Sequence, residues 1–118
     1  KNLEETNQNK SKYLSKKKSK KDKNDLKIWS SKILQEINSN INYPLIALQN
    51  QISGRVIIQM SITNKGILKK LSLIQSSGFD ILDNEVLRAV SNSDHYPSAP
   101  LSLSKKQYSF KLPIKFEI

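Results

Sequence analysis

The last twelve residues of the chain constrain its fold more than any other segment. Apolar side chains occupy every even position from Tyr108 to Ile118, and polar or charged ones occupy the odd positions except Pro113. This period of two predicts a β-strand with one buried face. Proline lacks the N–H that a central strand needs. The segment is therefore predicted to be an edge strand, whose even residues pair inward while its odd residues face an open edge.

An open strand edge can pair with another chain, and proteins protect such edges with charged residues or proline. Lys111, Pro113 and Lys115 give this edge partial protection. They fit an edge that is kept for controlled pairing, in which backbone hydrogen bonds give affinity and alternate side chains give specificity. They fit equally well an edge that is only blocked against aggregation. The strand alone leaves both interpretations open.

Two other segments carry helix patterns. The first helix is predicted to start at Asn24 or Asp25 and to end at residues 38–40, and the second to start with Asp80 as its cap. Their apolar positions recur every three or four residues, as on one face of a helix. These positions are Leu26, Trp29, Ile33 and Ile37 in the first helix, and Leu82, Val86, Ala89 and Val90 in the second.

The segment between the helices is typical of a β-hairpin. Apolar and polar residues alternate over residues 55–63, and Gly66 can take the positive φ of the turn that follows. The second strand, residues 67–75, is irregular because its apolar residues fall in two phases. Either both faces of this strand are partly covered, or a bulge near Lys69-Lys70 shifts the phase.

The order helix, hairpin, helix, strand predicts an α+β fold: two helices packed on one face of a three-stranded antiparallel sheet. We expect residues 25–118 to form this single domain.

Residues 1–24 hold nine Lys and three acidic residues, and so carry +6 of the chain's net +10. With few apolar residues, they are predicted to be a disordered Lys-rich linker. Its Lys cluster at residues 16–21 is either a solvated spacer or a contact for nucleic acid or anionic lipid.

The sequence offers no catalytic constellation. Cysteine is absent and His95 is the single histidine, so we expect no metal site, no cofactor and no enzymatic activity. Asp80, Asp83 and Glu85 could form an acidic site, but roles at the start of a helix explain them better. The three glycines are too scattered for a phosphate-binding loop.

The order and spacing of the turn and strand residues resemble the C-terminal domain family of TonB, the protein that couples inner-membrane energy to outer-membrane transporters. The similar features are Tyr43-Pro44-x-x-Ala47, Gly54-x-Val56, Gly66, Ser76-Ser77-Gly78, Leu82-Asp83 with Leu87, Ala89 and Val90, Tyr96-Pro97, Pro100, and Phe110-x-Leu112-Pro113-Ile114-x-Phe116. Departures are Gln51 and Ser53, where the family often has a small and an acidic residue, and the lack of proline before Pro44.

The resemblance implies a periplasmic domain of an inner-membrane-anchored protein that works beside ExbB and ExbD. Such a domain captures the TonB box, a short extended segment of an outer-membrane receptor, by strand addition, and transmits the proton-motive force for siderophore, haem or cobalamin uptake. The anchor and any proline-rich spacer are then expected before Lys1. The receptor-binding residues that the resemblance implies are Tyr43, Pro44, Tyr108, Ser109, Phe110, Lys111, Leu112, Pro113, Ile114 and Lys115.

Two alternatives stay open. The same fold could serve as an envelope adaptor that needs no receptor, or the Lys-rich segment could bind nucleic acid. The folded part favours the former over the latter, because Trp29, Phe110 and Phe116 fit core positions rather than a stacking platform. The sequence does not identify the receptor or the transported ligand. It leaves the oligomeric state open as well, since an edge strand can pair with its own copy in a homodimer.

Overall fold

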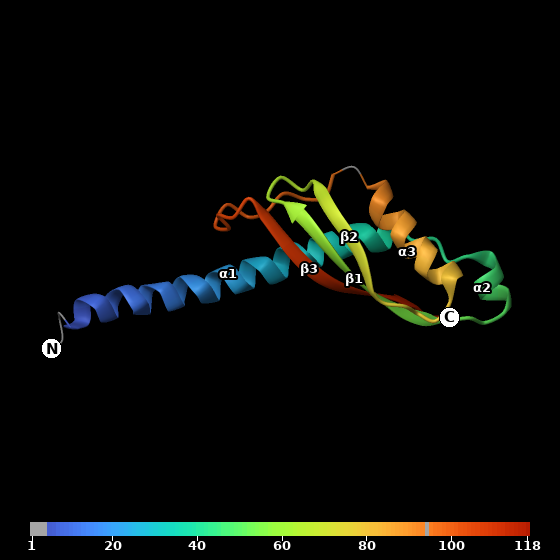
Figure 1. Ribbon diagram of the computed structural model, residues 1–118, viewed down its shortest axis with the longest axis horizontal. Coiled ribbons are helices and arrows are strands. Elements are labelled where there is room, and N and C mark those ends of the chain that lie inside the picture. Colours follow the sequence, from blue (N-terminus) through green and yellow to red (C-terminus); the bar gives the residue numbers. More distant parts are fainter. Residues whose placement is uncertain (1–4, 94) are drawn as a thin grey trace.

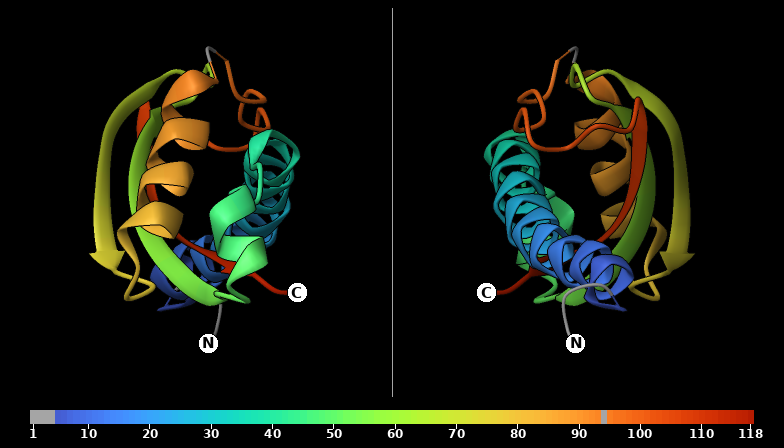
Figure 2. Two further views of the ribbon diagram at one scale, coloured as in Figure 1. Left: turned by 90° about the vertical axis from the view of Figure 1, so that its right-hand side faces the viewer. Right: turned by 90° about the vertical axis from the view of Figure 1, so that its left-hand side faces the viewer.

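The structure is a computed structural model that describes the backbone of residues 5–93 and 95–118 and the side chains of residues 23–93 and 95–118. Its elements are α1 (Glu5–Asn40), α2 (Leu45–Gln49), β1 (Gly54–Thr63), β2 (Leu68–Gln75), α3 (Asp80–Asn92) and β3 (Gln107–Phe116) (Figure 1). The strands form one antiparallel sheet in the order β2-β1-β3, and the helices lie on one side of it (Figure 2). The predicted α+β fold and the edge position of the last strand are confirmed.

Helix α1 is longer than the sequence pattern indicates. It begins at Glu5, so the predicted start at Asn24 or Asp25 is wrong, whereas the predicted end at residues 38–40 is confirmed. The physical reason is composition: no Gly or Pro precedes Pro44, and Lys, Glu and Gln are good helix formers. The division into a linker, 1–24, and a domain, 25–118, stays a prediction, and residues 1–4 lie outside the described residues.

The core lies between the sheet and the helices. Trp29, Ile33 and Ile37 of α1 are fully buried, as are the even residues of β1 from Val56 to Ile62. Leu112, Ile114 and Phe116 of β3 close the core from the sheet side, and Leu82, Val86, Ala89 and Val90 close it from α3. The predicted apolar stripes are therefore confirmed. Ile118 is a correction, because it lies beyond the end of β3 and is 70% exposed.

The register of the hairpin explains the irregular second strand. Ile74 is an extra residue in β2, because Ile57 pairs with Gln75 and Ile58 pairs with Leu73. A second bulge lies at Lys69, because Ser61 pairs with Lys70 and Ile62 pairs with Leu68. This bulge puts Leu68 on the same face as Leu71, which pairs with the buried Met60 of β1. The bulge is the second of the two interpretations that the sequence left open.

No helix in the described part of the chain combines the length and the apolar character that crossing a membrane requires.

The start of α3 is held by a buried carboxylate. The predicted Asp80 cap is wrong: Phe79 occupies the N-cap position, and no side chain caps the helix. Asp83, only 6% exposed, instead accepts hydrogen bonds from the Ser77 N–H at 2.9 Å, the Ser77 hydroxyl at 2.7 Å and the Ser76 hydroxyl. Burial raises the pKa of Asp83, but the bonds from Ser76 and Ser77 together outweigh it and hold the pKa below its usual value.

Replacing Asp83 by asparagine is expected to lower the free energy of unfolding at neutral pH by about 1–3 kcal/mol, because charge-assisted hydrogen bonds are lost. The depressed pKa contributes stability above the unfolded-state pKa of about 4, and this contribution disappears as the pH falls through the folded-state pKa. Chemical denaturation from pH 7 downward should show the two proteins converging at acid pH. A difference that is independent of pH would contradict the role assigned to the Asp83 charge.

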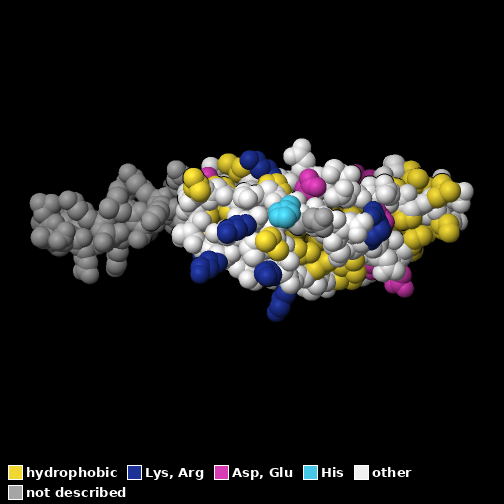
Figure 3. Space-filling view, turned by 90° about the horizontal axis from the view of Figure 1, so that it is seen from above, with side chains coloured by type: hydrophobic (Ala, Val, Ile, Leu, Met, Phe, Trp, Pro, Cys, Tyr) yellow, Lys and Arg dark blue, Asp and Glu magenta, His cyan; other side chains and the backbone are white. Residues whose placement is uncertain are grey.

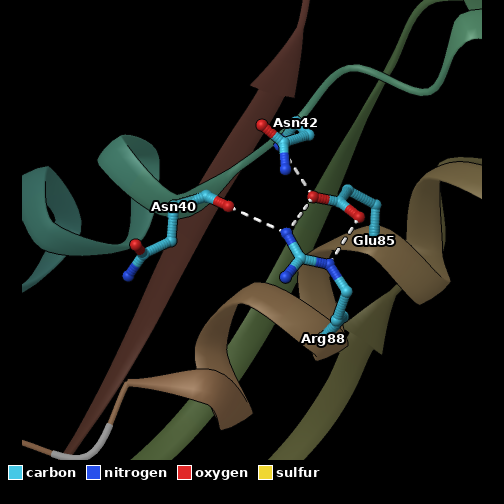
Figure 4. A network of polar contacts seen from close by, with 4 residues as sticks. All are labelled: Asn40, Asn42, Glu85 and Arg88. Atoms are coloured by element: carbon cyan, nitrogen blue, oxygen red, sulfur yellow. Dashed lines mark hydrogen bonds and ion pairs between the residues drawn. The ribbon is translucent and has the colours of Figure 1, made fainter.

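A second polar network joins α3 to the end of α1 (Figure 4). The Arg88 guanidinium donates to the Glu85 carboxylate at 2.6 Å and to the Asn40 carbonyl at 2.9 Å. The hydrogen bond from Arg88 holds the pKa of Glu85 below its usual value, against burial, and the Asn42 N–H adds a bond at 2.7 Å. Arg88 thus satisfies a carbonyl at the C-terminus of α1, where helix carbonyls lack partners. Glu85 has a structural role here.

Candidate functional site

The backbone of β3 turns alternate residues toward an open edge. The Thr63 N–H bonds to the Ile67 carbonyl at 2.8 Å, on the β2 side of β1, whereas the Asn64 N–H bonds to the Lys106 carbonyl at 2.9 Å, on the β3 side. Backbone groups alternate sides along a strand, so the even residues of β1 face β3. Their partners in the register are the even residues of β3, such as Leu112 opposite Ile58.

The odd residues of β3 therefore present their backbone groups to the outside of the sheet. Ser109, Lys111 and Lys115 each offer an N–H and a carbonyl there, and Pro113 offers only a carbonyl. These four side chains are exposed, while Leu112 and Ile114 are buried and Tyr108 and Phe110 are half-buried. The predicted site residues of β3 thus form two groups. The odd residues can bind an added strand, and the even residues pack into or against the core beneath them.

A groove runs beside the first half of this edge. Its volume is about 640 Å³, and one wall comes from α1. The lining residues are Lys23, Leu26, Lys27 and Ser30 of α1, and Lys105, Gln107, Tyr108, Ser109 and Phe110 of β3 and the loop before it. The α1 wall was not among the predicted site residues. The sequence carries no signal that places this flank of the helix beside β3 rather than β2.

Trp29 packs against two of the residues that line this groove. Its ring packs edge-on against Tyr108, with centroids 5.6 Å apart, and against Phe110, with centroids 5.2 Å apart. Its indole N–H donates to the Pro97 carbonyl at 2.7 Å. Aromatic pairs in this geometry add to the stabilisation from burial. Trp29 thus connects α1, the loop after α3 and the start of β3, and it is the single tryptophan of the chain.

The predicted Tyr43-Pro44 segment lies at the other end of β3. Tyr43 packs edge-on against Phe116, with ring centroids 5.3 Å apart, and its hydroxyl donates to the Ile52 carbonyl at 2.5 Å. Pro44 occupies the N-cap position of α2, a helix that the sequence analysis did not predict. The exposed side chains of Leu45, Ile46 and Leu48 follow. Figure 3 shows hydrophobic side chains gathered at this end of the molecule.

The described residues suit binding rather than bond chemistry. Side chains 23–93 and 95–118 include no group of three His, Cys, Asp or Glu that could hold a metal ion. Asp83 and Glu85 are engaged in the structural networks described above. His95 is exposed in the loop after α3. The most distinctive arrangement is the ladder of unpaired backbone groups on β3, which can form hydrogen bonds with an extended chain.

Comparison with known proteins agrees with the sequence resemblance. A family described as "Gram-negative bacterial TonB protein C-terminal" matches residues 39–118. The chain is 29% identical to Protein TonB of Neisseria meningitidis over 76 residues, which are 64% of this chain and 25% of that protein. It therefore spans about a quarter of the length of this curated relative.

Solved structures match across most of the chain. The solution structure of the Helicobacter pylori TonB C-terminal domain, residues 179–285, is 26% identical with a TM-score of 0.64, covering 76% of this chain and 80% of that one. The Pseudomonas aeruginosa TonB C-terminal domain is 22% identical with a TM-score of 0.55, covering 66% and 78% of the two chains, and supports the fold alone.

Proposed function

This chain belongs to the family of Gram-negative bacterial TonB C-terminal domains, a family of energy transducers rather than enzymes, and from that premise we propose that it is the receptor-binding domain of a TonB-like transducer. It captures the TonB box of an outer-membrane receptor as an added strand on β3. The observation that carries the proposal is the open edge, where Ser109 and Lys111 present two N–H donors next to each other on the outward side. The family membership favours controlled pairing over a merely blocked edge.

The groove supplies the chemistry that selects the captured segment. A strand added beside Ser109 and Lys111 lies over the groove, so its side chains on the helix side contact Leu26 and Phe110. Apolar residues are favoured at these positions. The cations around the groove, among them Lys23, favour acidic residues elsewhere in the segment. An extended segment with both apolar and acidic residues is thus the best ligand.

Capture of the segment must be coupled to a pulling force before it can open the receptor. The chain is held in the periplasm by an inner-membrane anchor beside ExbB and ExbD, which supply the energy of the proton gradient. Pulling on the captured segment opens the receptor for siderophore, haem or cobalamin uptake. In this chain the pull enters through α1, which packs directly on the inner face of β3 through Trp29. Tyr43 and Pro44 add a second receptor contact beyond the other end of the strand.

A TonB-box peptide with methylated backbone nitrogens tests the pairing directly. Alternate residues of an added strand direct their N–H groups toward β3, and the residues between direct theirs away. Methylation of an N–H that faces β3 is expected to weaken binding about 10-fold or more, because a hydrogen bond is lost and the methyl group blocks close approach. Isothermal titration calorimetry with a series of singly methylated peptides should show weak and normal affinities at alternate positions.

The methylated positions in the alternate phase are the matched controls, since they carry the same added methyl group. Equal affinity at all positions, with the unmodified peptide bound, would mean that the peptide binds through side chains and not as an added strand. A scrambled peptide of the same composition should bind at least 10-fold more weakly than the TonB-box peptide, because it lacks the apolar residues at the spacing of the groove.

A further inference from the structure

The face of the sheet that points away from the helices is basic. The three strands contain Arg55, Lys69, Lys70, Lys111 and Lys115, and neither Asp nor Glu. All five side chains are exposed. The helices lie on the other side of the sheet (Figure 2), so no described helix covers this face. We refer to it as the open face.

The register shows which cations share the open face. The even residues of β1 and the corresponding residues of β3 are directed toward the core, so the odd residues Arg55, Lys111 and Lys115 are directed toward the open face. Lys70 joins them because it pairs with Ser61, another odd residue of β1. The hydroxyl oxygens of Ser61 and Ser109 lie 2.9 Å apart on the same face.

The charges of the open face are not compensated within the described part of the chain. Arg55 and Lys115 are directly opposite each other, and like charges in this position destabilise a sheet. A pocket of about 310 Å³ lies beside them, and Glu117 lines it without forming an ion pair with either. Among described side chains, none of the strand cations is within 4.0 Å of a carboxylate. An external anion would relieve this repulsion.

We infer that the open face binds an anionic phospholipid surface. Lys111 and Lys115 are about 13 Å apart along β3, and Lys70 is two strands away, about 10 Å across the sheet. Cations spread in this way match a charged plane better than one small anion. Lys and Arg have long stems that place their charged groups at a common level over a curved sheet.

The same face is poorly suited to single-stranded nucleic acid. Stacking of bases requires exposed aromatic rings, and Tyr108, Phe110 and Phe116 are all directed toward the helices. Strand addition at the edge of β3 leaves the open face uncovered, so the two surfaces can act together. The inference goes beyond the proposed function and does not depend on it.

Vesicle binding by the full chain tests the inference. The probe is vesicles of phosphatidylcholine and phosphatidylglycerol in equal parts, with pure phosphatidylcholine as reference, in a co-sedimentation assay. Each cation near an anionic membrane contributes about fivefold to the partition coefficient, so the double variant Arg55→Gln with Lys111→Gln should lower it about 25-fold. The matched control is Lys27→Gln with Lys32→Gln on α1, which removes the same charge and should change partition less than about threefold.

The absence of cysteine allows a second readout. A polarity-sensitive fluorophore on Ser72→Cys, which is exposed on the open face, should shift to the blue with anionic vesicles, and one on Ser31→Cys of α1 should not. Equal losses in both double variants, or equal shifts at both labels, would show attraction by net charge alone and overturn the inference. The same variant ranking with a duplex oligonucleotide, and no preference for anionic vesicles, would identify a nucleic-acid surface and overturn it too.

Discussion

Replacing Gly66 by alanine is expected to lower the free energy of unfolding by about 3–4 kcal/mol, a large share of the stability of a small domain. Gly66 has a φ of +87°, and a Cβ there would lie 2.0 Å from the Tyr96 carbonyl oxygen and 2.9 Å from its carbon. Because those atoms belong to the backbone, the hairpin turn and the 96–97 loop must separate. That movement breaks the hydrogen bond from the Tyr96 N–H to the Gly66 carbonyl, 2.9 Å long.

Gly78 provides the matched control for this prediction. Its φ is +93°, so an alanine there has similar backbone strain, but no atom beyond Gly78 and its two chain neighbours lies within 4 Å of the added Cβ. Gly78→Ala should therefore lower the free energy of unfolding by only about 1–2 kcal/mol. Urea denaturation, followed by Trp29 fluorescence, measures both variants. Equal losses in the two would show that the contact between the hairpin turn and the Tyr96 loop does not contribute to stability.

The second large effect is on binding. Lys111→Pro removes an N–H that faces outward from β3 and places a proline ring where the captured strand approaches. The lost bond and the unsatisfied partner carbonyl together predict a 30-fold to 1000-fold loss of affinity for the TonB-box peptide. The fold is expected to tolerate the change, because Pro113 already occupies the same phase of the strand.

Lys111→Gln is the control for charge, since it removes the ammonium group and keeps the N–H. Its affinity should fall less than fivefold at physiological salt. Titrations that follow Trp29, which packs against Phe110 beside the edge, measure both variants. A folded Lys111→Pro protein that binds as well as Lys111→Gln does would refute edge pairing at this position.

The edge strand was predictable because its evidence is local. Alternation from Tyr108 onward fixes the buried face, and Pro113 excludes a central place in the sheet, so both follow from the sequence of one strand. For the second strand, the sequence is equally consistent with a bulge near Lys69-Lys70 and with partial cover of both faces. Two phases of apolar residues indicate an irregularity, but only the pairing with β1 shows that Lys69 and Ile74 are the extra residues.

The groove and the short helix α2 were not predictable in this way. Leu26 and Lys27 line the groove because α1 crosses β3 on one particular flank, and helix periodicity does not define that crossing. The α2 segment is too short for a recognisable period, and Pro44 indicates only that a turn or helix can begin there. Asp83 lies in the first turn of α3, as predicted, but its hydrogen bonds to Ser76 and Ser77 were not predicted, because they depend on how the loop before the helix folds.

The central claim is that β3 accepts an extended segment on its open edge. Amide hydrogen exchange of the chain, with and without the TonB-box peptide, tests this claim most directly. We expect new protection at the N–H groups of Ser109, Lys111 and Lys115, with little change at the even residues of β3, which already bond to β1. Protection confined to the helices, with the odd residues of β3 still exchanging freely, would contradict the account.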